Sequence, residues 1–253
     1  AGVNAGPTSM VSGHLGAPLA VHRFGSGRPV LLLHGLFSSA EVNWFRYGTA
    51  QRLAEAGLEC IMPDLRAHGQ SAAPHDPADY PADVLVKDAL TLVSALELTD
   101  YDLVGFSLGA RTALGAVLAG LTPRRLVLGG MGLEGLTGWA RRSAHFVDAI
   151  DRFGTIERGD PAFIAQAFMK TMQVDRVAAR QLLLSVQDIA PEAVARVTMP
   201  TLVVCGADDS DNGSATALAD ALPDGRYAEV PGNHMSSVTK PEFGAAIVRF
   251  LAG

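Results

Sequence analysis

The feature that most restricts the fold of this chain is a regular alternation of short apolar runs with longer helical patterns. The apolar runs, typical of strands, cover residues 19–24, 29–33, 59–63, 101–106, 125–129, 201–205 and 226–230. The helical patterns cover residues 51–56, 82–98, 108–121, 215–222 and 241–251. Strands that are apolar on both faces need helices on both sides, so the alternation predicts an α/β fold with a mostly parallel, doubly wound sheet.

Two other segments carry expectations about organisation. Residues 136–194 show only helical patterns, which predicts a helical cap, or lid, over 134–194 that is inserted after the sixth strand. The core would then comprise 10–133 and 195–253, although the same helices could instead be additional core helices. Gly25-Ser26-Gly27 predicts a hairpin turn between the first two strands. Residues 1–9 are small and polar, and we expect a non-native or frayed end, with Met10 as the native start.

Composition excludes several classes of protein. The chain has 253 residues and a net charge of −6, which argues against a nucleic-acid-binding surface. No run approaches the roughly 18 apolar residues of a membrane span, and Cys60 and Cys205 offer neither a disulfide framework nor a metal-ligand spacing. We therefore expect no membrane, metal or cofactor, and a cytoplasmic location by default; a homodimer is left open. The glycosylation triplet at Asn212 is given no weight.

The pentapeptide Gly105-Phe106-Ser107-Leu108-Gly109 lies between a predicted strand and a predicted helix. A serine on such a turn adopts a strained backbone that exposes its hydroxyl, and the flanking glycines avoid collisions with the neighbouring strand and helix. This context predicts that Ser107 is a nucleophile. The alternative is that Ser107 is an ordinary helix N-cap.

A serine nucleophile needs a neighbouring base that is held by a third group. Asp208 and Asp209 follow the strand at 201–205, and His234 follows the strand at 226–230. Both loops lie past the carboxyl ends of strands, where open α/β sheets bind ligands. We predict His234 as the base, against the alternative of an ordinary loop histidine. These residues leave open which aspartate orients it.

Acyl transfer also needs two N–H donors for the developing oxyanion. One is expected from Leu108, the residue after the nucleophile. The other is expected from Leu36, in the loop after the strand at 29–33, because Gly35 allows the backbone to approach closely. The alternative is that His34-Gly35 is a simple strand-end turn.

Five motifs in this order resemble the α/β-hydrolase superfamily: His34-Gly35, Asp64 to Ser71, the Ser107 pentapeptide, Gly206 to Asp209, and Gly232-Asn233-His234. Within it, the chain resembles small serine esterases, cofactor-free perhydrolases and enol-lactonases. The resemblance implies that the acid is Asp209, three residues after the glycine. It also implies structural roles for Arg66 and His68 near the site, and it departs from the family at Ala67, where glycine is usual. A serine at position 107 argues against the haloalkane dehalogenases of this fold.

The predicted activity is hydrolysis of a small, fairly apolar carboxylic ester or lactone through an acyl-enzyme. Candidates for an apolar pocket wall are Phe37, Trp44, Phe146, Phe168, Met169 and Met172. Carbon–carbon bond hydrolysis or perhydrolysis at the same site are alternatives, as is a ligand receptor with vestigial activity.

Other candidate sites are weaker. Gly130 to Gly135 match a dinucleotide-binding pattern, but they follow a late strand and lead into the predicted cap, so we interpret them as a flexible start of the cap. His14, His22 and His75 form no metal-ligand grouping. We expect His145 to face solvent or to pack.

Overall fold

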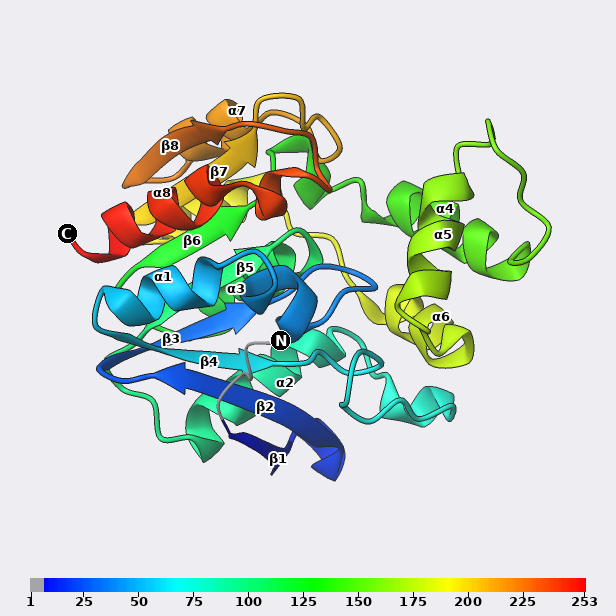
Figure 1. The fold of residues 1–253 in the computed structure, drawn as a ribbon, viewed down its shortest axis with the longest axis horizontal. Coiled ribbons are helices and arrows are strands. Elements are labelled where there is room, and N and C mark those ends of the chain that lie inside the picture. Colours follow the sequence, from blue (N-terminus) through cyan, green and yellow to red (C-terminus); the bar gives the residue numbers. More distant parts are fainter. Residues whose placement is uncertain (1–6) are drawn as a thin grey trace.

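The computed structural model describes residues 7–253 and is built on one eight-stranded sheet with the order β1-β2-β4-β3-β5-β6-β7-β8 (Figure 1). The strands are β1 (Thr8–Ser12), β2 (Pro18–Gly25), β3 (Arg28–Leu33), β4 (Leu58–Pro63), β5 (Asp102–Phe106), β6 (Leu126–Gly129), β7 (Thr201–Gly206) and β8 (Gly225–Val230). β2 is antiparallel to both of its neighbours, whereas every pairing from β4 to β8 is parallel. The predicted fold class is confirmed.

Helices cover both faces of this sheet (Figure 1). One face carries α1 (Thr49–Glu55) and α8 (Pro241–Leu251), and the other carries α2 (Val84–Ala95), α3 (Leu108–Leu118) and α7 (Ala215–Ala221). Residues 30–33 of β3 are all apolar because both faces of the strand are covered by helices. Leu31 and Leu33 pack toward α2 and α3, whereas Val30 and Leu32 pack toward α1 and α8.

The expectation of a frayed end is wrong for two residues. Thr8 and Ser9 belong to β1 and pair with His22 and Val21 of β2. The Thr8 hydroxyl also forms a 2.8 Å hydrogen bond with Nδ1 of His22. These residues are ordered because they extend the antiparallel edge of the sheet; residues 1–6 lie outside the described part of the chain.

The predicted hairpin between β2 and β3 is also wrong, because β4 lies between them. Gly25 and Gly27 have φ values of +85° and +117°, and a Cβ on either residue would collide with backbone at Gly57 or Leu58. The turn therefore crosses the start of β4 and needs glycine for that close approach. β3 takes parallel partners on both sides, which is the arrangement that the connection through α1 permits.

Three helices separate β6 from β7: α4 (Trp139–Asp151), α5 (Phe163–Thr171) and α6 (Arg176–Ser185). We call them the cap helices. They lie beyond the ends toward which the parallel strands point, at the right of Figure 1. Short helical turns complete the structure: His14–Gly16, Glu41–Phe45, Pro77–Asp79, Glu134–Leu136, Pro191–Arg196 and Ser237–Thr239.

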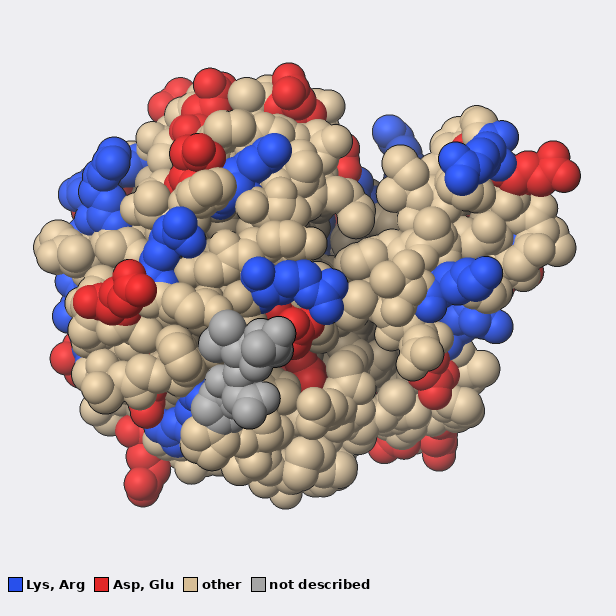
Figure 2. Space-filling view, viewed as in Figure 1, with Lys and Arg blue, Asp and Glu red and all other residues tan. Residues whose placement is uncertain are grey.

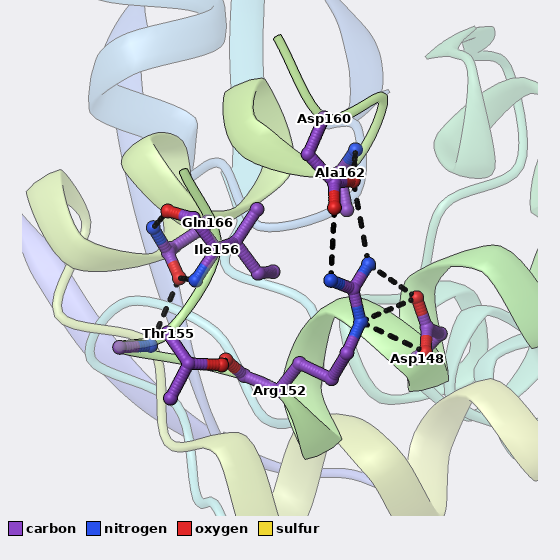
Figure 3. A network of polar contacts seen from close by, with 8 residues as sticks. Asp148, Arg152, Thr155, Ile156, Asp160, Ala162 and Gln166 are labelled. Carbon is purple, nitrogen blue, oxygen red and sulfur yellow. Dashed lines mark hydrogen bonds and ion pairs between the residues drawn. The ribbon is translucent and has the colours of Figure 1, made fainter. Parts of the chain in front are cut away.

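A polar network fixes the loop between α4 and α5 (Figure 3). The Arg152 guanidinium pairs with Asp148 at 2.8 Å and with Asp160 at 2.9 Å. The Gln166 carboxamide accepts from the N–H of Ile156 and donates to its carbonyl. These exposed or half-buried contacts add little stability individually, but together they define the path of the loop that leads into α5.

The surface carries charges of both signs. Acidic and basic side chains are interspersed on the face shown in Figure 2. Among residues 7–253, no helix combines the length and the apolar character that crossing a bilayer requires.

Candidate active site

The site forms at the carboxyl ends of β3 and β5, where the strand order reverses. From β3 the chain continues to β4 on one side, and β5 lies on the other side. The loops after β3 and β5 therefore leave in different directions and open a crevice between them. The loop after β3 lies against the turn after β5, because a Cβ added to Gly35 would lie 3.6 Å from the Cβ of Ser107.

Ser107 occupies a strained turn between β5 and α3, with φ 55° and ψ −112°. A Cβ on Gly105 would collide with the Gly109 backbone, and a Cβ on Gly109 would collide with the Leu33 carbonyl. The two glycines are therefore required by the close passage of strand, turn and helix. The Ser107 side chain makes no capping hydrogen bond to α3, so the N-cap interpretation is wrong.

The structure brings Ser107, His234 and Asp209 together in one chain of hydrogen bonds. Oγ of Ser107 lies 2.8 Å from Nε2 of His234, and Nδ1 of His234 lies 2.8 Å from Oδ2 of Asp209. The imidazole stacks on Phe106, with 5.1 Å between ring centroids. Asp208 is exposed and makes no such contact.

The protonation of this relay follows from the state of Asp209. Burial alone would raise the pKa of Asp209, but the hydrogen bond from His234 and the N–H of Asp211 hold it below its ordinary value. Because the carboxylate can only accept, Nδ1 of His234 carries the proton and donates to it. Nε2 is then free to accept the hydroxyl proton of Ser107.

Two backbone N–H groups beside Ser107 are available for a ligand. Leu108 is the first residue of α3, so its N–H has no acceptor within the helix. In the loop after β3, Gly35 donates to Oδ1 of Asn43 and Phe37 donates to Nε2 of His68. No acceptor within residues 7–253 engages the N–H of Leu36, and Leu36 and Leu108 both line the cavity.

Two buried histidines hold the Leu36 loop in place. His34 accepts from the N–H of Leu65, and His68 accepts from the N–H of Phe37, each at 2.9 Å. Burial lowers the pKa of His68 to about 3 and also lowers that of His34, so both rings are neutral acceptors. This network was not predicted from the sequence. The signal that could have indicated it is that each of the two motifs, at 34–35 and 66–68, contains one of the two histidines.

The segment from Asp64 to Ser71 is structural, as the resemblance implies. Arg66 forms a buried ion pair with Asp88 at 2.7 Å. Asp64 lies 3.0 Å from Nε2 of His22 and accepts from the N–H of Ala40. Ala67 has φ 71°, a left-handed conformation that explains why glycine is usual there in the family.

A cavity of about 440 Å³ lies between this site and the cap helices. Ser107, His234, Phe37 and Phe146 all line it, and the rings of Phe37 and Phe146 meet edge to face at 5.7 Å. The cap side of the wall consists of Trp139, Arg142, His145, Phe146, Pro161, Ile164, Ala165 and Phe168. The cap helices thus supply much of the cavity wall.

Three pocket predictions are wrong. Trp44 is fully buried in the core between the sheet and the α1–α8 layer. Met169 is buried within the α2–α3 core cluster, and Met172, the residue after α5, is not among the residues that line the cavity. The spacing of these residues identified the apolar face of each helix correctly. It did not show which part of the structure packs against that face.

Two other sequence signals have structural explanations. Asn212 is buried and donates to the carbonyl of Gly130, so its amide is not presented for glycosylation. Gly132 and Gly135 lie where a Cβ would collide with backbone at Asn212 or Gly213. The glycine pattern at 130–135 therefore serves close packing of the segment that leads to the cap, rather than flexibility.

Asp209, Asp211 and His234 have potential ligand atoms within 4.8 Å of one another. In this group, His234 Nδ1 and Asp209 Oδ2 already bond to each other. The arrangement therefore also places a second carboxylate, that of Asp211, beside the imidazole.

A doubly wound sheet with a strained serine turn at its switch point, facing a histidine from a later strand, is the architecture of α/β hydrolases. The chain belongs to this family: the model of the Alpha/beta hydrolase family matches residues 30–247.

Similar proteins include several kinds of hydrolase. The chain is 37% identical over 103 residues to an epoxide hydrolase of Caballeronia sordidicola, covering 41% of this chain and 30% of that protein. It is 34% identical over 118 residues to a 2-hydroxymuconate semialdehyde hydrolase of Pseudomonas sp. (strain CF600), covering 46% and 40%. The esterase EaEST from Exiguobacterium antarcticum superimposes with a TM-score of 0.79 at 22% identity, covering 98% of this chain and all of that one. The matches to the first two proteins thus cover well under half of their lengths.

Proposed function

We propose that this protein is a serine hydrolase that cleaves small, fairly apolar carboxylic esters or lactones through an acyl-enzyme. The observation that carries the proposal is the relay from Ser107 through His234 to Asp209, because it opens on a largely apolar cavity. The similarity to an esterase over the whole fold supports the same class.

In the first step, Ser107 Oγ attacks the ester carbonyl and its proton passes to Nε2 of His234. The carbonyl oxygen becomes an oxyanion, for which the N–H groups of Leu36 and Leu108 are the donors, and one such donor is typically worth about 3 kcal/mol of barrier. Asp209 stabilises the imidazolium through its bond to Nδ1. The intermediate then collapses, and His234 gives the proton to the departing alcohol.

In the second step, a water molecule attacks the acyl carbonyl while His234 accepts its proton. A second oxyanion forms in the same donor pair. Its collapse breaks the bond to Ser107 Oγ, which takes the proton back from His234 as the acid leaves. The enzyme returns to its starting state without a net change.

One of the relatives is an epoxide hydrolase, which raises the possibility of an epoxide substrate. A serine nucleophile at position 107 favours a carbonyl substrate instead. If Ser107 opened an epoxide, the product would be an alkyl ether of the enzyme. Water has no carbonyl to attack in such an ether, so turnover would stop after one cycle. An acyl ester of Ser107 has that carbonyl.

Turnover of p-nitrophenyl acetate by Ser107→Ala and His234→Ala tests the proposal. We expect at least about a thousand-fold loss of kcat in each variant, because members of such a relay act as a unit. A fluorophosphonate should label Ser107, as read by peptide mass spectrometry. Full turnover in both variants would refute the assignment.

The similarity to 2-hydroxymuconate semialdehyde hydrolase gives a second candidate, cleavage of a carbon–carbon bond at the same site. Assaying an ester beside a ring-cleavage diketone, with and without peroxide, separates ester hydrolysis from carbon–carbon cleavage and from perhydrolysis. A burst of acyl-enzyme followed by negligible steady-state turnover would instead favour a ligand receptor.

A further inference from the structure

The cavity wall carries charges that an apolar ester does not require. Apart from the histidines, its charged lining residues are Arg111, Arg142 and Asp211. Arg111 is explained by structure, because its guanidinium is buried and donates to the carbonyls of Gly135 and Leu136, which anchors the start of the cap to α3. Arg142 is held less firmly, by one hydrogen bond and one loose ion pair, both to Asp211.

Arg142 projects from α4 with most of its hydrogen-bonding capacity unused. Nη1 donates to the backbone carbonyl of Asp211 at 3.2 Å. Nη2 forms a loose ion pair with Oδ2 of Asp211 at 3.8 Å, a separation that is too long for a direct hydrogen bond and leaves the forked donors free. A guanidinium has five N–H donors and stays charged in proteins, so a partly desolvated arginine with one bond retains a strong affinity for an anion.

The position of Arg142 relates it to the relay. Asp211 stands between them, since its carboxylate lies within 4.8 Å of a ring nitrogen of His234 and 3.8 Å from Arg142. The guanidinium carbon is also 5.4 Å from the ring centroid of Phe146. Much of the remaining wall is apolar, including Leu36, Phe37 and Phe168. A ligand that complements this cavity has an apolar body and one anionic end.

We propose that Arg142 binds a free carboxylate of the substrate, remote from the bond that is cleaved. The substrates would then be carboxylate-bearing esters or lactones with an apolar body. This inference rests on the proposed function, and it narrows the substrate class of the same site.

A merely structural role makes a different prediction. If Arg142 only tethers α4 to the loop after β7, its loss should slow neutral and anionic esters alike. If it binds a substrate carboxylate, its loss should change the ratio between the two. The selectivity ratio therefore separates the two roles.

Two matched pairs of esters provide the measurement. In the first, p-nitrophenyl hydrogen adipate is compared with p-nitrophenyl 6-methylheptanoate, in which an isopropyl group replaces the acyl carboxylate. In the second, 4-acetoxybenzoate is compared with 4-isopropylphenyl acetate, which moves the charge to the alcohol side. We expect the protein to favour the anionic member of at least one pair in kcat/KM.

Arg142→Met should lower that preference by about 30-fold or more, the usual consequence of truncating one side of a desolvated charge pair. Arg142→Lys should retain part of it, because the charge stays but the forked donors are lost. Arg141→Met is the matched control: Arg141 is the exposed neighbour on the same helix and does not line the cavity, so its loss should leave the ratio unchanged.

A preference for the neutral ester in both pairs, or an equal effect of Arg142→Met on both members, would overturn the inference. Failure of the proposed function looks different, because no ester would then show turnover that depends on Ser107. In that case isothermal calorimetry with adipate tests the carboxylate site directly. Binding that is lost in Arg142→Met and kept in Arg141→Met supports the site. Absence of adipate binding refutes it.

Discussion

The imidazole of His68 accepts a hydrogen bond from the backbone N–H of Phe37 at 2.9 Å, and this contact joins the loop after β4 to the loop after β3. Only a neutral ring can accept through Nε2 while its Nδ1 donates to the carbonyl of Arg66. The position of the Leu36 N–H therefore depends on a histidine that stays unprotonated.

This dependence predicts a loss of stability in mild acid. Burial lowers the pKa of His68 from 6.5 to about 3, so between these values the unfolded chain binds a proton that the folded chain does not. The free energy of unfolding should consequently fall as pH drops below about 6.5, by up to ~1.4 kcal/mol per pH unit for this group. Urea unfolding at pH 7.5 and 5.5 measures the slope.

His68→Gln is the corresponding variant, because the carboxamide oxygen can accept from Phe37 but does not titrate. We expect a shallower pH slope than in the parent protein, with His34 still contributing because burial lowers its pKa too. An unchanged slope would mean that His68 is not the neutral buried group that its surroundings indicate.

The two adjacent aspartates after β7 make a second prediction. Asp209→Asn should reduce kcat by about ten-thousand-fold, because an amide no longer fixes the tautomer of His234 or stabilises its charge. Asp208→Asn should leave kcat near the parent value, since Asp208 is exposed and makes no contact with His234. Steady-state kinetics of the pair, with thermal melting to verify folding, tests this. Equal losses would be incompatible with the assigned relay.

Helix α3 allows a test of the packing that creates the serine turn. Gly109→Ala places a methyl group against the Leu33 carbonyl, which is backbone and cannot move aside. We expect a cost of about 3 kcal/mol or more, together with loss of activity. Gly115→Ala on the same helix meets only the end of the Val86 side chain, so a far smaller change in urea midpoint is expected. Comparable midpoints would show that the elbow tolerates a Cβ.

The buried Arg66–Asp88 pair predicts a large stability effect remote from the chemistry. Arg66→Met leaves the Asp88 carboxylate buried without its partner, at a cost of about 3–5 kcal/mol. Arg46→Met removes an exposed pair with Glu41 and should cost less than ~1 kcal/mol. Denaturant unfolding at pH 7 compares them, and a small effect of Arg66→Met would indicate that Asp88 finds another donor.

Several predictions made from the sequence succeed because they depend on neighbours in the chain. Continuous apolar runs predict buried parallel strands, because helices cover both faces of a parallel sheet and the side chains on both faces of each strand are therefore buried. The glycines around Ser107 predict a tight turn, and the structure shows which backbone atoms demand them. Asp209 emerged from the resemblance rather than from local chemistry, because Asp208 is an identical side chain one position away.

The errors have a different cause. The hairpin at 25–27 is locally reasonable, but β4, which lies further along the chain, lies between β2 and β3 and pairs with both. Trp44 and Phe146 both lie on apolar faces, yet Trp44 packs beneath the sheet and Phe146 lines the cavity. The spacing of apolar residues shows which side of a helix is apolar. It does not show whether that side packs against the sheet or faces a cavity.

By itself, then, the sequence determined the succession of strands from β2 to β8 and of the helices between them, the strained serine turn and the chemical types that follow the strand ends. Only the tertiary structure decided which aspartate meets His234, that two neutral histidines hold the Leu36 loop, and that Arg142 faces the cavity from α4. The physical reason is that backbone preference acts over a few residues, whereas desolvation and hydrogen bonding in a site depend on groups that only folding brings within a few ångströms.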